Sequence, residues 1–340
     1  MDLKDRPKFT EIRRLITFAA FLYLSLISQS QVIKGTVLDK TSGKPVGYAS
    51  LYFTGTFVGT TTDKDGNFEL DVTKNQNMPL KVSAIGFYSI TVNDFLKGNP
   101  VIIYMESKVY ELGEVAVRSK SLAKRRKANL MTFRQVFIGT SENARNCYIT
   151  NENEITFNYN SDRDTLKAYS SQPLEIENKS LGYKITYYLD KFEYDKITGA
   201  FVYRGDMIYR EDLSVGSEQK NNFERKRRAA YLGSRMHFFR ALWENKLHSS
   251  GFSVFNLYEQ SLSSNDIVMV VSGNKKFFRY YENLQIEYYS NKSKTTLEFL
   301  CTLVPFDSSG YYDEFCIKWE GSMADRRIAD WLPYEYNPEK

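Results

Sequence analysis

A regular alternation of short apolar segments and turn residues dominates the chain between residues 31 and 105. Val32–Leu38 and Phe68–Val72 place apolar or β-branched residues at alternate positions, as half-buried strands do. Clusters of turn residues separate the segments, with Asp39–Pro45 and Asp63–Asn67 the densest. The other predicted strands are Ala49–Phe53, Thr60–Thr62, Leu80–Ile85, Tyr88–Val92 and Val101–Met105. About seven strands at this spacing predict a small β-sandwich.

The segment Asp63–Asn67 (DKDGN) can be interpreted in two ways. Gly66 suits a hairpin position with positive φ, and the Asp63 side chain can accept hydrogen bonds from backbone amides two residues on. The same residues resemble the start of a calcium-binding loop. An EF-hand, however, needs Gly at the sixth position of the loop and Glu at the twelfth, where this chain has Phe68 and Lys74. A structural turn is therefore expected, and no metal site is predicted.

The segment GTVLDKTSGKPVGYASLYFTGTFVGTTTDKDGNFELDV, followed by LKVSAIGFYSITV, resembles the carboxypeptidase regulatory-like (transthyretin-like) domain. The matching positions are Gly35, Val37, Gly43, Pro45, Ala49, Gly59, Thr62, Asp63, Gly66, Phe68, Leu70, Ser83, Gly86 and Phe87. The resemblance implies a seven-stranded β-sandwich over residues 31–117. Such domains accompany zinc carboxypeptidases and precede TonB-dependent outer-membrane receptors.

Neither of those two activities fits the rest of the chain. A receptor would need a plug and a barrel of about 22 strands, more than the residues after the sandwich supply. A zinc carboxypeptidase needs His-x-x-Glu and a later His, whereas the histidines here are His237, followed by Phe238-Phe239-Arg240, and His248. We therefore predict no catalytic residues and no cofactor.

The first thirty residues have the layout of a secretory signal peptide. Arg13 and Arg14 precede the apolar segment Leu15–Ile27, and Ser28 and Ser30 supply small residues before a cleavage site. The alternative is a membrane anchor, but 13 apolar residues would reach only about 20 Å as a helix. We expect an exported protein in the periplasm or at the outer-membrane face of a Gram-negative bacterium, with no transmembrane span after cleavage.

Three cysteines, Cys147, Cys301 and Cys316, would then face an oxidising compartment. Two alternatives stay open for them. One pair can form a disulfide, for instance Cys301 with Cys316 across a hairpin, or all three are small buried apolar side chains.

Residues 118–129 form a basic linker in our division of the chain. The segment Arg118–Lys127 (RSKSLAKRRK) has six basic residues and no acid, which predicts a solvated linker or a first helical turn. Contact with an anionic lipid or lipopolysaccharide surface is an alternative. Export makes a nucleic-acid partner improbable, so we predict none.

The pattern of residues 130–340 predicts a second, strand-rich α+β domain. Aromatic residues, which favour pleated surfaces, make up 15% of the chain. Leu130–Phe137 has helical spacing, and one long helix is predicted over Glu218–Ser249, with an apolar stripe at Leu232, Met236, Phe239 and Trp243. The predicted strands include Ile155–Tyr159, Tyr183–Leu189, Phe201–Arg204, Met207–Arg210, Phe252–Leu257, Ile267–Val271, Leu284–Tyr289 and Leu297–Val304. The fold class is mainly β.

The predicted long helix carries the candidate ligand-binding residues Arg228, Tyr231, Arg235 and His237. The first three fall at i, i+3 and i+7, so one helix face would present donors to a carboxylate or phosphate. The alternative is that these side chains anchor the helix against the sheet.

The segments Pro173–Asn178, Leu181–Tyr183 and Arg228–Phe239 resemble exported Gram-negative proteins that carry the same front domain. That resemblance brings no activity with it. We expect a noncatalytic envelope protein in which the sandwich is a docking or spacer module and the second domain binds a protein, peptide or glycan. The alternative is an enzyme of unfamiliar type that uses Tyr231, Arg235 and His237.

Overall fold

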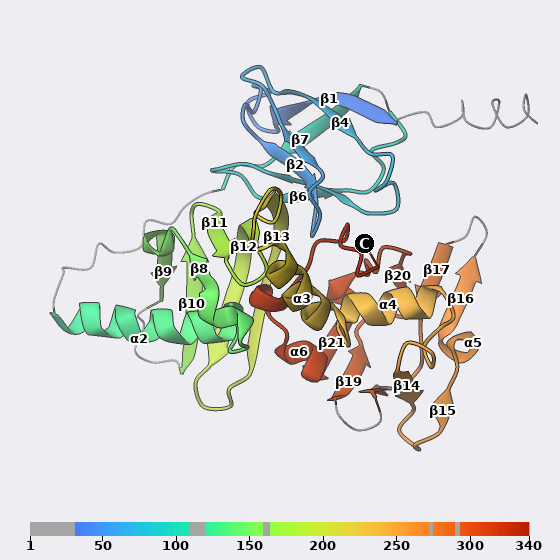
Figure 1. Ribbon diagram of the computed structural model, residues 1–340. Helices are drawn as coiled ribbons and strands as arrows, with labels where there is room; N and C mark the ends of the chain where they lie inside the picture. Colours follow the sequence, from blue (N-terminus) through green and yellow to red (C-terminus); the bar gives the residue numbers. More distant parts are fainter. Residues whose placement is uncertain are drawn as a thin grey trace, which may run out of the picture.

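The computed structural model of this protein describes residues 31–98, 100–108, 120–158, 164–271, 275–289 and 293–339. The predicted signal peptide lies outside these residues, and so do residues 118 and 119 of the predicted linker. Strands predominate over helices, which confirms the prediction of a mainly β protein. In Figure 1 the N-terminal strands, in blue, form one body that rests on a larger strand-rich unit. We call residues 120–339 the second unit.

The N-terminal body has seven strands in two sheets, as predicted. One sheet has the order β4-β1-β7 and consists of β1 (Val32–Asp39), β4 (Asn67–Asp71) and β7 (Val101–Met105). The other has the order β3-β2-β5-β6 and consists of β2 (Ser50–Phe53), β3 (Gly59–Thr61), β5 (Leu80–Ser83) and β6 (Ile90–Val92). Strand β1 runs parallel to β7 and antiparallel to β4.

The turn at Asp63–Asn67 has the predicted chemistry. Asp63 Oδ1 accepts hydrogen bonds from the backbone amides of Asp65 and Asn67, at 2.9 and 2.8 Å, and Gly66 has φ +77°. The strand that leaves the turn buries Phe68 and Leu70 on the face that also holds Val72. The alternation of the sequence therefore sets both the turn and the inward face of β4.

The second unit begins with α2 (Lys120–Phe137), an 18-residue helix. Residues 120–127 of the basic segment thus belong to a helix, one of the two predicted forms. The ring of Phe133 lies 4.6 Å from that of Phe192, and the ring of Phe137 lies 4.8 Å from that of Tyr187, so α2 packs its aromatic face on the adjoining sheet. Gly139, with φ +105°, follows the end of the helix. Among the described residues, no helix is both long and apolar enough to cross a membrane.

The adjoining sheet has six strands in the order β8-β11-β12-β10-β9, with β13 also paired to β12. Its strands are β8 (Cys147–Ile149), β9 (Ile155–Phe157), β10 (Thr165–Ser170), β11 (Leu174–Asn178), β12 (Tyr183–Asp195) and β13 (Phe201–Asp212). The prediction of two strands over residues 201–210 was wrong. A single strand forms because β13 stays paired to the long β12, with two register shifts that absorb the irregularities.

The predicted long helix is two helices, α3 (Lys220–Tyr231) and α4 (Arg235–Trp243). Gly233, with φ +74°, ends the first, and the Ser234 side chain caps the second by accepting a hydrogen bond from the His237 amide at 3.1 Å. Leu232 lies at this break and is 37% exposed, so it does not belong to the buried stripe. The stripe on α4 instead buries Phe238 and Phe239 together with Met236 and Leu242.

Helix α4 packs on two further sheets that share one hydrophobic core. The first sheet, in the order β15-β14-β18-β19-β21, contains β14 (Phe252–Phe255), β15 (Ser261–Leu262), β18 (Leu284–Tyr288), β19 (Ser293–Phe299) and β21 (Ile317–Gly321). The second, in the order β16-β17-β20, contains β16 (Val268–Val271), β17 (Lys275–Phe278) and β20 (Val304–Phe306). Two short helices connect strands of the two sheets, α5 (Ser264–Ile267) and η3 (Glu314–Cys316), and two more follow β21, α6 (Ser322–Asp325) and η4 (Ile328–Asp330).

Two predicted strands in this half have different limits. Ile267 ends α5, so the strand expected over residues 267–271 begins at Val268. The strand expected over residues 297–304 is divided between β19 and β20, and the turn between them contains Cys301. Cys301 forms a disulfide with Cys316, with 4.9 Å between the two Cα atoms, whereas Cys147 is a buried free thiol.

The sandwich contacts the second unit through the turn that joins β2 to β3. Gly55 donates a backbone hydrogen bond to Met207 O at 2.8 Å and accepts one from the Tyr334 amide at 2.9 Å. Phe57 packs against the rings of Tyr183 and Tyr209. A Cβ on Gly55, which has φ +72°, would lie 2.8 Å from the Tyr334 ring, so the close approach requires glycine.

Candidate functional site

A cavity of about 280 Å³ lies between the sandwich and the second unit. Its volume is close to the lower end of the roughly 300–1,000 Å³ typical of small-molecule sites. The sandwich contributes one wall, from Thr54, Gly55, Pro79, Lys81, Thr91 and Asn93. The second unit contributes the others, from Gly205–Met207, Ala230, Ser234–Met236, Tyr311–Phe315, Met323, Arg326, Asp330–Leu332 and Tyr334. Neither unit encloses the cavity by itself.

The wall of the second unit is assembled from segments far apart in sequence. Asp206 comes from the middle of β13, Arg235 begins α4, and Glu314 opens the short helix η3. The disulfide of Cys316 and the hydrogen bond that Asp313 Oδ1 accepts from the Phe315 amide, at 3.1 Å, fix the segment around Glu314. The cavity therefore depends on the tertiary arrangement of three separate elements.

A buried ion pair at the cavity wall joins the two units. Lys81 Nζ on β5 lies 3.1 Å from Asp206 Oδ1 on β13, and the two side chains are only 10% and 5% exposed. Burial raises the pKa of Asp206, and Lys81 opposes this by favouring the ionised carboxylate. Removing either partner would leave the other charge in a poorly solvated place.

The two arginines at the cavity already have protein acceptors. Arg235 donates to the carbonyl oxygens of Met323 and Arg326 and to the Tyr312 hydroxyl, at 3.1, 3.4 and 3.2 Å. Arg326 donates to the carbonyl oxygens of Ala230 and Leu232. Because these guanidinium groups are engaged with the protein, they offer few donors to an anionic ligand.

Glu314 differs from the other charged groups around the cavity. Its side chain lines the cavity, and no hydrogen bond or ion pair engages its carboxylate within the described residues. Burial, with a smaller contribution from Asp206, raises the pKa of Glu314 to about 7, while Arg235 and Lys81 act in the opposite direction. At neutral pH the cavity thus holds an unpaired carboxyl group that is about half protonated.

The sequence-based candidates Arg228, Tyr231, Arg235 and His237 do not form one site. The break at Gly233 separates the first two from the last two. Arg228 is exposed and donates to Pro338 O at 3.3 Å. Of the four residues, only Arg235 is part of the cavity wall.

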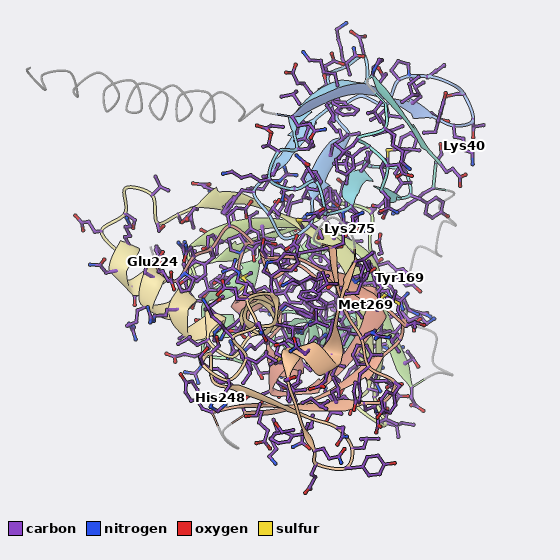
Figure 2. All side chains as sticks on the ribbon, turned by 90° about the vertical axis from the view of Figure 1, so that its right-hand side faces the viewer. Lys40, Tyr169, Glu224, His248, Met269 and Lys275 are labelled. Atoms are coloured by element: carbon purple, nitrogen blue, oxygen red, sulfur yellow. A yellow bond between two sulfur atoms is a disulfide. The ribbon has the colours of Figure 1, made fainter. Side chains whose placement is uncertain are left out.

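Tyr231 and His237 lie together, but in a packed environment rather than at the cavity. Their rings are 4.7 Å apart, and His237 also contacts Phe252 and Tyr288. His237 Nδ1 accepts a hydrogen bond from the Gly233 amide at 3.1 Å, and burial lowers the pKa of His237 to about 4. This pair therefore stabilises the junction of α3 and α4. His248 is exposed and lies on the side of the second unit remote from the sandwich (Figure 2).

The sequence did not predict Lys81, Asp206 and Glu314, the charged residues that form the ion pair and the carboxyl group at the cavity. Each lies in a segment that alternates or turns like many others, and the three are far apart along the chain. One signal was present: Lys81 and Asp206 are charged residues inside predicted apolar strands or between them. A charge in such a position is rarely buried unless it is paired.

No metal centre is found in the described part of the chain, where no three His, Cys, Asp or Glu side chains are placed to hold one ion. The acidic side chains at the cavity are engaged separately: Asp206 with Lys81, and Asp330 with Ser141 and Asn143. The arrangement favours recognition of an organic group through hydrogen bonds, charge and aromatic contact.

Comparison with known proteins gives one result for the front of the chain. No curated protein matches the sequence. The model of the carboxypeptidase regulatory-like domain family matches residues 33–117, about a quarter of the chain, which agrees with the resemblance noted from the sequence and with the seven strands observed. Residues 33–117 of this protein are a carboxypeptidase regulatory-like domain.

Proposed function

We propose that this protein is a noncatalytic, exported cell-envelope protein that binds a small ligand, or one unit of a peptide or glycan, between its sandwich and its second unit. The observation that carries the proposal is the cavity whose walls come from both units and whose lining includes Glu314, a carboxyl group that has no hydrogen-bond or ion-pair partner among the described residues. In this interpretation the regulatory-like domain is a docking module that closes a binding site on its own chain.

The aromatic side chains around the cavity support binding. Tyr311, Tyr312, Phe315, Trp331 and Tyr334 all contribute to its wall. Aromatic rings supply large contact areas with few rotatable bonds, and they are common in sites for peptides and sugars. Phe315 is 43% exposed, so part of this aromatic surface is accessible to a ligand.

Screening by native mass spectrometry tests this proposal. The full chain, produced with export so that the cell performs any cleavage, would be mixed with short peptides, mono- and disaccharides and peptidoglycan fragments. We expect bound complexes with one class, and we expect Thr91→Trp to abolish them because the exposed Thr91 on β6 lines the cavity. Tyr104→Trp, on an exposed face of the sandwich, is the matched control. Binding that survives Thr91→Trp, or no binding in any class, would contradict the proposal.

Export is supported by the disulfide between Cys301 and Cys316, because such bonds persist in oxidising compartments. A fusion of residues 1–40 to alkaline phosphatase, which is active only after export, tests this part. High phosphatase activity is expected, together with its loss when Leu15–Ile27 is deleted. An inactive, cytoplasmic fusion would refute export.

An enzyme is the second candidate, and one observation favours it. Asp206 and Glu314 both lie at the cavity. Burial raises the pKa of both carboxyl groups, and Asp206 raises the pKa of Glu314 further. Shifted carboxyl groups of this kind are found in the acid–base pairs of enzymes. A ligand found in the screen that is converted by the wild type but not by Glu314→Gln would establish catalysis. Unchanged recovery of every bound ligand over many hours would support the noncatalytic function.

A further inference from the structure

We infer that the cavity recognises a protonated primary amine, whose ammonium group binds against Glu314. The inference rests on the proposed function, because it assigns the chemical class of the ligand in the same cavity. It follows from which of the charged groups around the cavity already have a partner in the protein and which one does not.

The cations at the cavity have their counter-groups within the protein. Lys81 pairs with Asp206 at 3.1 Å, and the guanidinium groups of Arg235 and Arg326 donate to main-chain carbonyl oxygens. An anionic ligand would have to compete with these contacts. These contacts therefore disfavour the binding of a carboxylate or phosphate in the cavity.

The carboxylates show the opposite pattern at one position. Asp206 has Lys81, Asp330 accepts from Ser141 Oγ at 3.0 Å, and Asp313 accepts from the Phe315 amide. The carboxylate of Glu314 has no such contact within the described residues, although it is largely surrounded by protein. A buried ionised carboxylate without a donor is unfavourable, so the site is completed by a ligand that brings a charged donor.

The groups that act on Glu314 come from every wall of the cavity. Asp206 on β13 and Asp313 beside it raise its pKa, whereas Arg235 on α4 and Lys81 on β5 lower it. Burial is the largest influence, and it favours the neutral acid. An ammonium group within hydrogen-bond distance would reverse that balance and ionise Glu314, so binding should release protons near neutral pH.

Aromatic side chains can surround the rest of such a ligand. Tyr311, Tyr312, Phe315 and Trp331 line the same cavity as Glu314. Faces of aromatic rings attract cations, and their apolar surface covers the carbon atoms next to an amino group. The cavity volume of about 280 Å³ suits a lysine side chain or one amino sugar, and both sources supply the same ammonium chemistry.

Isothermal titration calorimetry on the full chain tests the inference with two matched pairs of probes. The first pair is n-pentylamine and 1-pentanol, and the second is glucosamine and glucose. Within each pair the probes differ in the amino or hydroxyl group, so the pairs distinguish an alkyl source from a sugar source. We expect at least one amine to bind at least about tenfold more tightly than its hydroxyl partner, because a charge-assisted hydrogen bond replaces a neutral one.

Proton linkage provides a readout specific to Glu314. In buffers of different ionisation enthalpy at pH 7, binding of n-pentylamine, which stays protonated up to pH 8, should release about half a proton, and its affinity should rise about tenfold from pH 6 to pH 8 as the carboxyl group ionises. Glu314→Gln should lose at least about tenfold in amine affinity and all of the proton release. Glu320→Gln, which changes the net charge equally at an exposed residue paired with Lys318, should behave as wild type.

Three results would overturn the inference: hydroxyl probes that bind as well as the amines, amine binding unchanged in Glu314→Gln, or binding without proton release at pH 7. If neutral ligands bind in the screen and Thr91→Trp blocks them, the binding function stands and only the amine class is rejected. If neither the screen nor the amines give binding that Thr91→Trp blocks, both proposals fall.

Discussion

Lys81 and Asp206, which are separated by more than a hundred residues in the sequence, form a 3.1 Å ion pair that joins the sandwich to the second unit. The pair is almost completely buried, and it lies beside the cavity to which both residues contribute. Because the charges belong to different units, the pair links the relative position of the units to the integrity of the site. The attraction between two buried charges is largely offset by the cost of removing them from water, so the loss of one partner is more destabilising than the loss of both.

Asp206→Asn should lower the free energy of unfolding by about 3–5 kcal/mol, because it leaves the Lys81 ammonium buried without a counter-charge. The double variant Lys81→Met/Asp206→Leu should be less destabilised than Asp206→Asn alone, since it removes both charges. Urea unfolding followed by tryptophan fluorescence measures both. The exposed pair Lys34–Glu69, at 2.8 Å, is the control, and its removal should change stability by no more than about 1 kcal/mol. Equal effects at the two pairs would contradict the burial argument.

Glu314 should make stability depend on pH between about 4.5 and 7. Its pKa is 4.5 when unfolded and about 7 when folded, so the folded chain binds more protons in this window and stability falls as pH rises through it. Relative to Glu314→Gln, the wild type should lose about 3 kcal/mol between pH 4.5 and pH 8. Denaturant unfolding of both proteins across this range measures the difference. A constant difference would show that Glu314 titrates normally, and Glu320→Gln should show no such trend.

Reduction of the bond between Cys301 and Cys316 should destabilise the protein by about 3 kcal/mol, the value expected for a closed loop of about 15 residues. The variant Cys301→Ser/Cys316→Ser should show the same loss and no further response to dithiothreitol. Cys147 should stay unlabelled by thiol reagents at pH 8 until the protein unfolds, because burial raises the pKa of its thiol to about 12. More than one reactive thiol in the native, oxidised protein would exclude the disulfide.

Gly233→Ala should be more destabilising than Gly216→Ala, although both glycines have positive φ. A Cβ on Gly233, at φ +74°, would lie 2.7 Å from the Tyr288 ring, whereas Gly216, at φ +69°, has no heavy atom within 4 Å of that position. We expect about 1 kcal/mol for Gly216→Ala from backbone strain alone and about 3 kcal/mol for Gly233→Ala from strain and overpacking. Thermal and urea unfolding compare them. Similar losses would mean that the break between α3 and α4 tolerates a side chain.

The spacing of apolar residues predicted the strands well where one face of a strand is buried and the other is exposed. Val101–Met105 was predicted with the limits that β7 has, and the Asp63 turn formed with the expected hydrogen bonds. The predicted helix over residues 218–249 failed because its apolar residues continue in helical phase across a break. That break depends on Gly233 and the capping Ser234, and the spacing of apolar residues contains no information about these two positions.

The candidate site shows the same limit on a larger scale. Arg228, Tyr231 and Arg235 appear adjacent when one continuous helix is assumed, and the helix break separates Arg235 from the other two. Only Arg235 contributes to the cavity, together with residues from the sandwich, β13 and η3 that no spacing rule connects.

The mainly β fold class and the sandwich family could be predicted from the sequence, because strand alternation and turn chemistry are local properties of a few consecutive residues. Three features depend on the tertiary arrangement: the contact of Lys81 with Asp206, the pairing of Cys301 with Cys316, and the position of Glu314 at the cavity with no partner among the described residues. Burial and charge pairing depend on distances between segments that are far apart in the sequence. Those distances are set only when the separate cores pack together.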